Sequence, residues 1–154
     1  MELKTPSKLE KILAAGHHAV TSECGPPRGS DPEAIVKKAE LIKDHVDAIN
    51  ITDNQTSVTR MCSLAACIRM KLMGLEPVLQ MVTRDRNRIA LQSDILTAYS
   101  LGIDNMLLLT GDHTNLGDHK QAKPVFDLDS VQLVKIAADL QKGKDMVGND
   151  LLNA

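Results

Sequence analysis

The fold is decided by residues 76–112, which read EPVLQMVTRDRNRIALQSDILTAYSLGIDNMLLLTGD. An apolar run over 76–82 predicts a strand, and the segment 89–101, closed by Gly102, predicts a helix. A second apolar run over 105–110 predicts another strand. A strand, a helix and a strand in this order predict two parallel strands joined by a right-handed crossover.

The same alternation extends toward the N-terminus. Strands are expected over 18–24 and 46–52, and a helix over 58–72 follows the second of them. Between these strands, residues 30–33 combine a capping Ser, an early Pro and an acid, which predicts the start of a helix. That helix carries apolar residues at helical spacing, namely Ile35, Ala39, Leu41, Ile42 and Val46.

Two further helices are expected near the ends of the chain. Residues 3–15 predict a short amphipathic helix with Leu9, Ile12 and Leu13 on one face. At the other end, a polar loop over 113–128 precedes a helix that starts at Ser130. The whole chain therefore alternates strands with helices four times.

This alternation predicts an α/β fold. Four βα units are half of a TIM barrel, the (β/α)₈ fold. A flavodoxin-like open sheet has the same periodicity, so the alternation alone leaves both folds open. In either fold, ligands bind at the carboxyl ends of the strands, which makes polar residues there the candidates for function.

Composition argues against several classes of protein. The 154 residues fit one domain, and the formal net charge is -2 with both signs interspersed. Nucleic-acid binding is not expected, because such proteins carry a basic face. No apolar run approaches the ~20 residues of a membrane span, and the charged N-terminus does not resemble a signal peptide. A cytoplasmic protein is therefore expected, and three cysteines without CxxC spacing predict neither a disulfide framework nor a metal site.

Two acids stand at strand ends and are the candidates for catalysis. Glu23 ends an apolar strand next to a rigid Gly-Pro-Pro turn, where burial would favour the protonated acid and suit it to proton donation. A partly exposed carboxylate paired with an Arg is the competing interpretation. Asp112 follows Gly111 at the end of another strand, and we expect it to project toward the same face as Glu23. A turn Asp that binds its own loop is equally compatible with the pattern.

Uncharged hydrogen-bonding residues also occur at strand ends. Thr52, Asn54 and Gln80 are placed to hold the polar edge of a cofactor, although such residues often satisfy only the loop backbone. The basic run over 84–88 could bind phosphate or a polyglutamyl tail, but its alternating Asp and Asn favour a solvated helix start. His113 and His119 in one loop are weak signs of metal binding. Cys24 beside Glu23 is better explained as a small buried residue than as a reactive one.

Several runs of sequence together resemble the methylenetetrahydrofolate reductase family. They occur in the family's order and spacing: ECGPPRGSD (23–31), NITDN (50–54), RDRNRIALQSD (84–94), LTGD (109–112), and GDH (117–119) with AKPVFDLDSV (122–131). Each run alone is a weak match, but their combination is specific. The resemblance implies that residues 1–154 are the N-terminal half of a TIM barrel that binds a flavin at the carboxyl ends of its strands.

The resemblance also implies a reaction. Reduced flavin, FAD or FMN, passes a hydride to 5,10-methylenetetrahydrofolate and yields 5-methyltetrahydrofolate, with NAD(P)H as a potential electron donor. Glu23 matches the family's general acid, which protonates the folate N10 and opens its five-membered ring. Asp112 matches the acid near flavin and folate. The remaining assignments are Asn54 to the folate, and Thr52, Gln80, Thr110, Gly111, Asp112 and Asp127 to the cofactor.

Two departures from the family pattern bear on these expectations. Gln80 stands where several relatives have a His, and Cys24-Gly25 replaces a Phe-Phe or Leu-Asn pair. The chain also stops where the family's fifth strand should soon follow. We therefore expect an unstable monomer that pairs with a second copy or with a C-terminal half, and some relatives have a zinc-containing partner.

A noncatalytic flavin- or folate-binding or assembly subunit that needs a partner is the alternative function. The missing half favours that alternative, whereas the presence of Glu23 and Asp112 favours a catalytic role. An unrelated TIM-barrel aldolase is disfavoured, because no strand ends in a Lys placed to form a Schiff base.

Overall fold

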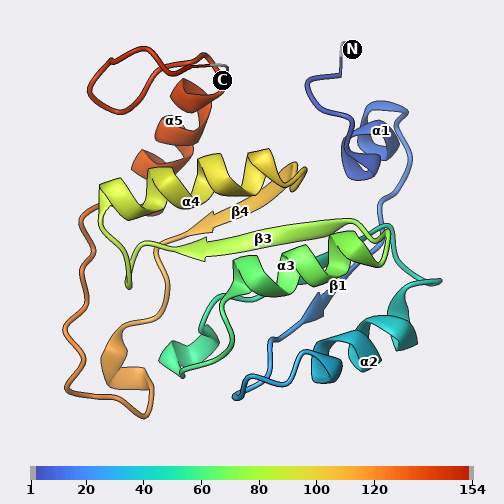
Figure 1. Ribbon diagram of the computed structural model, residues 1–154, viewed down its shortest axis with the longest axis horizontal. Helices are drawn as coiled ribbons and strands as arrows, with labels where there is room; N and C mark the ends of the chain where they lie inside the picture. The colour runs from blue at the N-terminus through green and yellow to red at the C-terminus, as the bar shows by residue number, and fades with distance from the viewer. Residues whose placement is uncertain (1–2, 153–154) are drawn as a thin grey trace.

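A four-stranded parallel sheet forms the centre of the protein in the computed structural model, which describes residues 3–152 (Figure 1). The strands lie side by side in the order in which they occur in the chain. They are β1 (Thr21–Cys24), β2 (Ala48–Ile51), β3 (Pro77–Val82) and β4 (Asn105–Leu109). All three pairings are parallel, so the carboxyl ends of the strands meet at one edge.

The sequential strand order decides between the two folds that periodicity left open. A flavodoxin-like sheet would place its second strand outside the first, in the order 2-1-3-4-5. The observed order β1-β2-β3-β4 contradicts that alternative and is the order of successive units in a (β/α)₈ barrel. The described residues form four parallel strands of such an arrangement, and the closed barrel stays a prediction.

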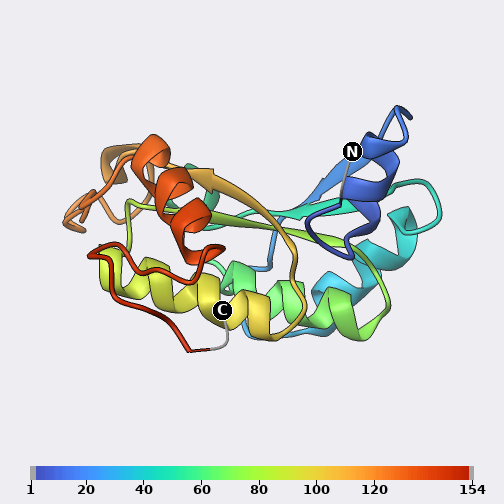
Figure 2. The same cartoon turned by 90° about the horizontal axis from the view of Figure 1, so that it is seen from above.

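Helices cover one face of the sheet. They are α2 (Glu33–Ile42), α3 (Ser63–Leu72), α4 (Arg88–Ser100) and α5 (Ser130–Leu140). Figure 2 shows α2, α3 and α4 in a row along the same side of the strands. Helix α5 packs on α4 and β4 and begins with a reciprocal capping box between Asp129 and Gln132.

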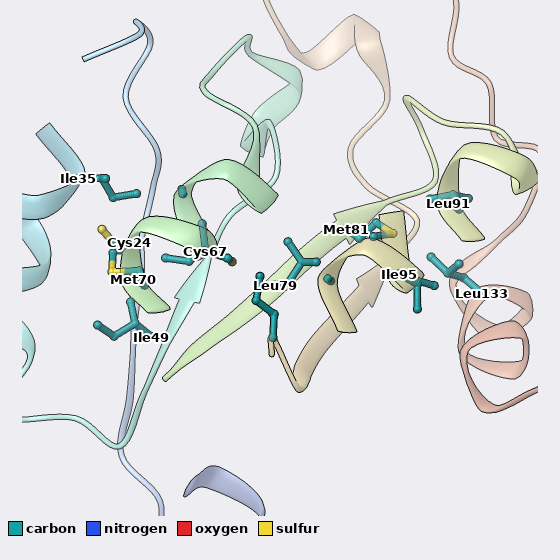
Figure 3. Packing of buried hydrophobic residues seen from close by; sticks show 14 of the residues in the cluster. Cys24, Ile35, Ile49, Cys67, Met70, Leu79, Met81, Leu91, Ile95 and Leu133 are labelled. Atoms are coloured by element: carbon teal, nitrogen blue, oxygen red, sulfur yellow. The ribbon is translucent and has the colours of Figure 1, made fainter. Parts of the chain in front are cut away.

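The hydrophobic core lies between this helical layer and the sheet (Figure 3). Cys24, Ile51 and Leu79 stand in register on neighbouring strands and are almost fully buried. Side chains from the helical layer pack against them, including Ile35, Ala39, Cys67, Met70, Leu91, Ile95 and Leu133. Cys24 is thus a buried core residue, as the sequence favoured, and burial raises the pKa of its thiol.

The opposite face of the sheet carries the other set of alternating side chains. Glu23, Asn50, Val78 and Asn105 form one row across the four strands. One step further along, the register aligns Gln80 with Leu107, and its continuation places Thr52 beside Gln80. Leu107 is 41% exposed, so this face is partly open to solvent within the described residues.

Helix α1 (Lys8–Ala14) lies at the amino ends of the strands rather than in the helical layer. Its N-cap, Ser7, is buried and donates a hydrogen bond of 2.7 Å to Glu76, which precedes β3. The Asn105 amide donates to the same carboxylate at 2.7 Å. Burial alone would raise the pKa of Glu76, but these hydrogen bonds outweigh it and lower the pKa.

The remaining differences from the sequence-based expectations concern element ends and two helix faces. Leu13 is 58% exposed and Leu41 is 78% exposed, so neither belongs to the core face expected for its helix. The helix expected over 58–72 begins only at Ser63, because a short 3₁₀ turn, η1 (Gln55–Ser57), and an extended segment precede it. No helix within residues 3–152 is both long and apolar enough to span a bilayer.

Candidate functional site

Three loops meet at the carboxyl edge of the sheet, and the loop after β2 has the most unusual backbone. Asn54, Thr56 and Ser57 all have positive φ, at 42°, 55° and 55°. A β-branched residue such as Thr56 rarely adopts this conformation. A non-glycine residue held in it lowers the free energy of unfolding by about 1–3 kcal/mol. The Thr56 amide donates to Asp112 Oδ2 at 3.1 Å, which ties this loop to the one after β4.

The same two loops also touch through Gly117. This glycine follows the 3₁₀ turn η2 (Thr114–Leu116) and packs against the backbone of Ser57. A Cβ at position 117 would lie 1.9 Å from the Ser57 carbonyl oxygen, so no side chain fits there. Contacts from the loop after β4 therefore hold the strained loop after β2 in place.

Arg84 joins all three loops from the interior. Its side chain is 1% exposed, and its guanidinium donates to both carboxylate oxygens of Asp85, at 2.8 and 2.7 Å. It also donates to the Asp112 carbonyl at 3.0 Å and to the Asn54 carbonyl at 3.2 Å. A buried guanidinium needs this many acceptors, because burying an unpaired charge is costly. Arg84 therefore fixes the backbone on either side of the site.

A second buried ion pair supports the first. Arg86 donates to Asp53 Oδ2 at 2.6 Å and lies 3.0 Å from Asp94 in α4. Asp53 is 3% exposed, and it also accepts a hydrogen bond of 3.0 Å from the Val82 amide. The basic run over 84–88 thus mainly forms ion pairs and hydrogen bonds within the protein. Its composition favoured a solvated helix start instead.

Gly111 brings the Asp112 loop close to β3. It has φ +90°, and a Cβ there would lie 2.9 Å from the Val82 Cβ. Only glycine meets both demands without strain. The backbone at this glycine therefore packs closely against the protein's own strand β3.

Glu23 lies on one edge strand of the described sheet, and Asp112 follows the other edge strand. Three strand spacings of about 4.8 Å separate β1 from β4, roughly 14 Å in total. Glu23 is exposed, as the competing interpretation of the sequence has it, but its side chain makes no hydrogen bond or ion pair within residues 3–152, so the Arg partner of that interpretation is not found there. Asp112 accepts a hydrogen bond at Oδ2 only. Both acids therefore have oxygens free for a ligand.

Between these edges, Gln80 and Thr52 face the same side of the sheet. Gln80 is 8% exposed, and its amide makes no side-chain hydrogen bond with a described residue. The Thr52 hydroxyl donates to Gln55 Oε1 at 2.6 Å and keeps its acceptor capacity. An amide without a side-chain partner among the described residues fits a ligand that offers both donors and acceptors.

Three other candidate residues are already engaged by the protein. The Thr110 hydroxyl accepts from the Ser130 amide at 3.1 Å and so helps to start α5. The Asn54 side chain accepts from the Arg60 amide at 2.9 Å. Asp127 binds the Arg88 guanidinium through both oxygens, each at 2.8 Å. Their assignment to cofactor or substrate stays a prediction, and these bonds would have to coexist with it.

The Asp127–Arg88 pair predicts a pH dependence of stability. The Arg88 side chain, followed by its backbone amide, lowers the pKa of Asp127 from 3.8 to about 2. A lowered pKa in the folded state stabilises the protein above the unfolded value, and this contribution is lost as pH falls from about 4 to 2. Thermal melts in that range should show a shallower decline for Asp127→Asn than for the wild type. Equal slopes would contradict the prediction.

A comparison with protein-family models matches residues 8–145 to a family described as Methylenetetrahydrofolate reductase. The chain belongs to the methylenetetrahydrofolate reductase family. The match confirms the resemblance found in the sequence and makes this chain a member of an oxidoreductase family of one-carbon metabolism. No curated protein matches the chain.

Membership of the methylenetetrahydrofolate reductase family, whose members are generally flavin-dependent, raises the question of whether the described residues fit a flavin. A flavin ring has a polar edge with donors and acceptors and two flat apolar faces. The free amide of Gln80 suits the edge, and Leu107 on the neighbouring strand suits a face. Within residues 3–152, no group of three or more His, Cys, Asp or Glu could hold a metal ion. The amide of Gln80 and the apolar surface of Leu107 fit the edge and the face of an organic ring.

Sequence reasoning missed the residues that shape this edge. The sequence pattern predicts only loop residues and a basic run here. In the structure, Asp53, Arg84 and Arg86 form the ion pairs at this edge of the sheet. A signal did exist, because acid and base alternate directly after a buried strand. Distinguishing an internal pair from a solvated one required knowing that neighbouring loops close over these side chains.

Proposed function

We propose that this chain takes part in the flavin-dependent reduction of 5,10-methylenetetrahydrofolate to 5-methyltetrahydrofolate. One observation carries the proposal: Glu23, Thr52 and Gln80 share the face of the sheet that the helices leave open, and Asp112 stands at its carboxyl edge. Family membership supplies the reaction class. When bound, a flavin, FAD or FMN, supplies the hydride, with NAD(P)H as the proposed electron donor.

The protein's own part is proton transfer and orientation. The Glu23 side chain makes no hydrogen bond or ion pair within residues 3–152, so its carboxyl group is free to contact a ligand. As a general acid, it donates a proton to N10 of the folate and opens the five-membered ring. Gln80 orients the ring edge of the cofactor through its amide.

Asp112 supplies negative charge at the other edge of the site. Its Oδ2 is held by the Thr56 amide, and its backbone carbonyl is held by Arg84, so the carboxylate is fixed before a ligand binds. A fixed charge stabilises a cationic folate intermediate without needing to reorient during the reaction. The strained loop at residues 54–57 thereby serves to position Asp112.

A noncatalytic subunit is the second candidate, and the open face of the sheet favours it. Leu107 is 41% exposed there, and β1 and β4 are edge strands within the described residues. We propose that this face is covered by a C-terminal half, by a second copy or by another partner subunit. Exposed edges and apolar residues favour such association.

Flavin retention tests the catalytic proposal. The purified chain is incubated with FAD or FMN, passed through gel filtration and examined by visible absorption. We expect a retained flavin band that dithionite bleaches and methylenetetrahydrofolate partly restores. Retained flavin that the folate does not reoxidise would support the noncatalytic candidate, and no retained flavin would contradict the catalytic one for this chain. A monomer mass by light scattering, together with a cooperative unfolding transition, would contradict the need for a partner.

A further inference from the structure

A cavity lies on the helical side of the molecule. It has a volume of about 430 Å³ and is formed by the loop after β1, the segment before α3, and α3 itself. This volume is within the range of about 300–1,000 Å³ typical of small-molecule sites. Three arginines line it, Arg28, Arg60 and Arg69, and no acid does.

This cavity is distinct from the candidate flavin site. Ala65 and Arg69 line it four residues apart in α3, so they lie on the same side of that helix. The buried residues of α3, among them Cys67 and Met70, point instead toward the core. The cavity is therefore on the outer side of the helical layer, whereas Glu23 and Gln80 occupy the uncovered face of the sheet.

Arg60 is held in place but lacks one hydrogen bond. Its amide donates to Asn54 Oδ1 at 2.9 Å, and its Nη1 donates to the Pro26 carbonyl at 3.0 Å. Its Nε is enclosed and has no acceptor within residues 3–152. Nη2 is not enclosed and makes no hydrogen bond with a described residue, so it is the donor that a ligand in the cavity can reach.

The charge in the cavity is also not balanced by the protein. Arg28 pairs with Asp118, but neither Arg60 nor Arg69 forms an ion pair within residues 3–152. Guanidinium groups bind carboxylate and phosphate through two parallel hydrogen bonds. We propose that this cavity binds a small anion through its phosphate or carboxylate oxygens, with Arg60 and Arg69 as the main contacts.

Calorimetric titration of the full chain tests the proposal with two probes, inorganic pyrophosphate and γ-linked triglutamate. We expect saturable binding of at least one probe. Arg69→Gln should weaken it by about tenfold or more, because hydrogen bonds to charged groups are among the strongest. Arg69 is exposed and unpaired, so this change should leave the fold intact. Lys11→Gln, which removes the same charge from α1, is the matched control and should bind like the wild type.

The two probes distinguish the chemistry of the ligand. Binding of pyrophosphate alone indicates a phosphate ligand, and binding of triglutamate alone indicates a carboxylate ligand. Arg60→Lys keeps the charge but loses the planar guanidinium that donates two parallel hydrogen bonds, so it should also weaken binding. Absence of saturable binding, or equal affinity in Arg69→Gln and Lys11→Gln, would overturn the proposal. Flavin retention by Arg69→Gln should be unchanged, which separates this site from the proposed reductase function.

Discussion

Glu23→Gln should slow folate reduction by roughly 100- to 10,000-fold, the usual contribution of a general acid. The amide has nearly the same shape but cannot donate a proton to N10. Because the side chain of Glu23 makes no hydrogen bond or ion pair within the described residues, its replacement should leave the melting temperature and flavin retention unchanged. The measurement is single-turnover reoxidation of dithionite-reduced, flavin-loaded protein by methylenetetrahydrofolate.

The matched control for this experiment is Glu33→Gln. Glu33 is exposed in the first turn of α2, on the helical side of the sheet. The substitution Glu33→Gln removes the same charge by the same chemical change, and the reoxidation rate should stay at the wild-type value. A Glu23→Gln rate within a factor of about three of wild type would assign proton donation to another group, since even a weak general acid contributes more.

Arg84→Met should lower the free energy of unfolding by about 1–3 kcal/mol, the usual cost of leaving buried hydrogen-bonding groups without a partner. Methionine fills much of the same volume, but the Asp112 and Asn54 carbonyls lose their donor and Asp85 loses its ion-pair partner. For a chain of this length, the melting temperature should fall by roughly 2–12 °C. Thermal unfolding followed by circular dichroism measures the change.

Arg69→Met provides the comparison for Arg84→Met. Arg69 is exposed and has no ion-pair partner within residues 3–152, so the same substitution should change stability by no more than about 0.5 kcal/mol. Similar losses in both variants would mean that the buried ion pair contributes little. The Arg84 variant should also bind flavin less tightly, because the Asp112 loop loses one of its anchors.

The location of the candidate site could be predicted from sequence, but its internal contacts could not. Polar residues after apolar strands indicated the carboxyl edge, and parallel pairing brought those loops together. The apolar neighbours of Glu23 leave both a buried acid and a partly exposed carboxylate open. It is exposed in the described residues because alternate side chains of a strand face opposite sides, and only the side of Cys24 is covered by helices.

The sequence by itself determined the elements, the α/β class and the family, because hydrophobic periodicity, caps and motif spacing are local properties of the chain. Only the tertiary structure decided the sequential strand order, the burial of Arg84 and Asp53, and the pairing of Asp127 with Arg88. These features join residues that are distant in sequence, such as Arg86 and Asp53. Whether a charge is solvated or paired depends on which loops fold over it, and no local pattern records that.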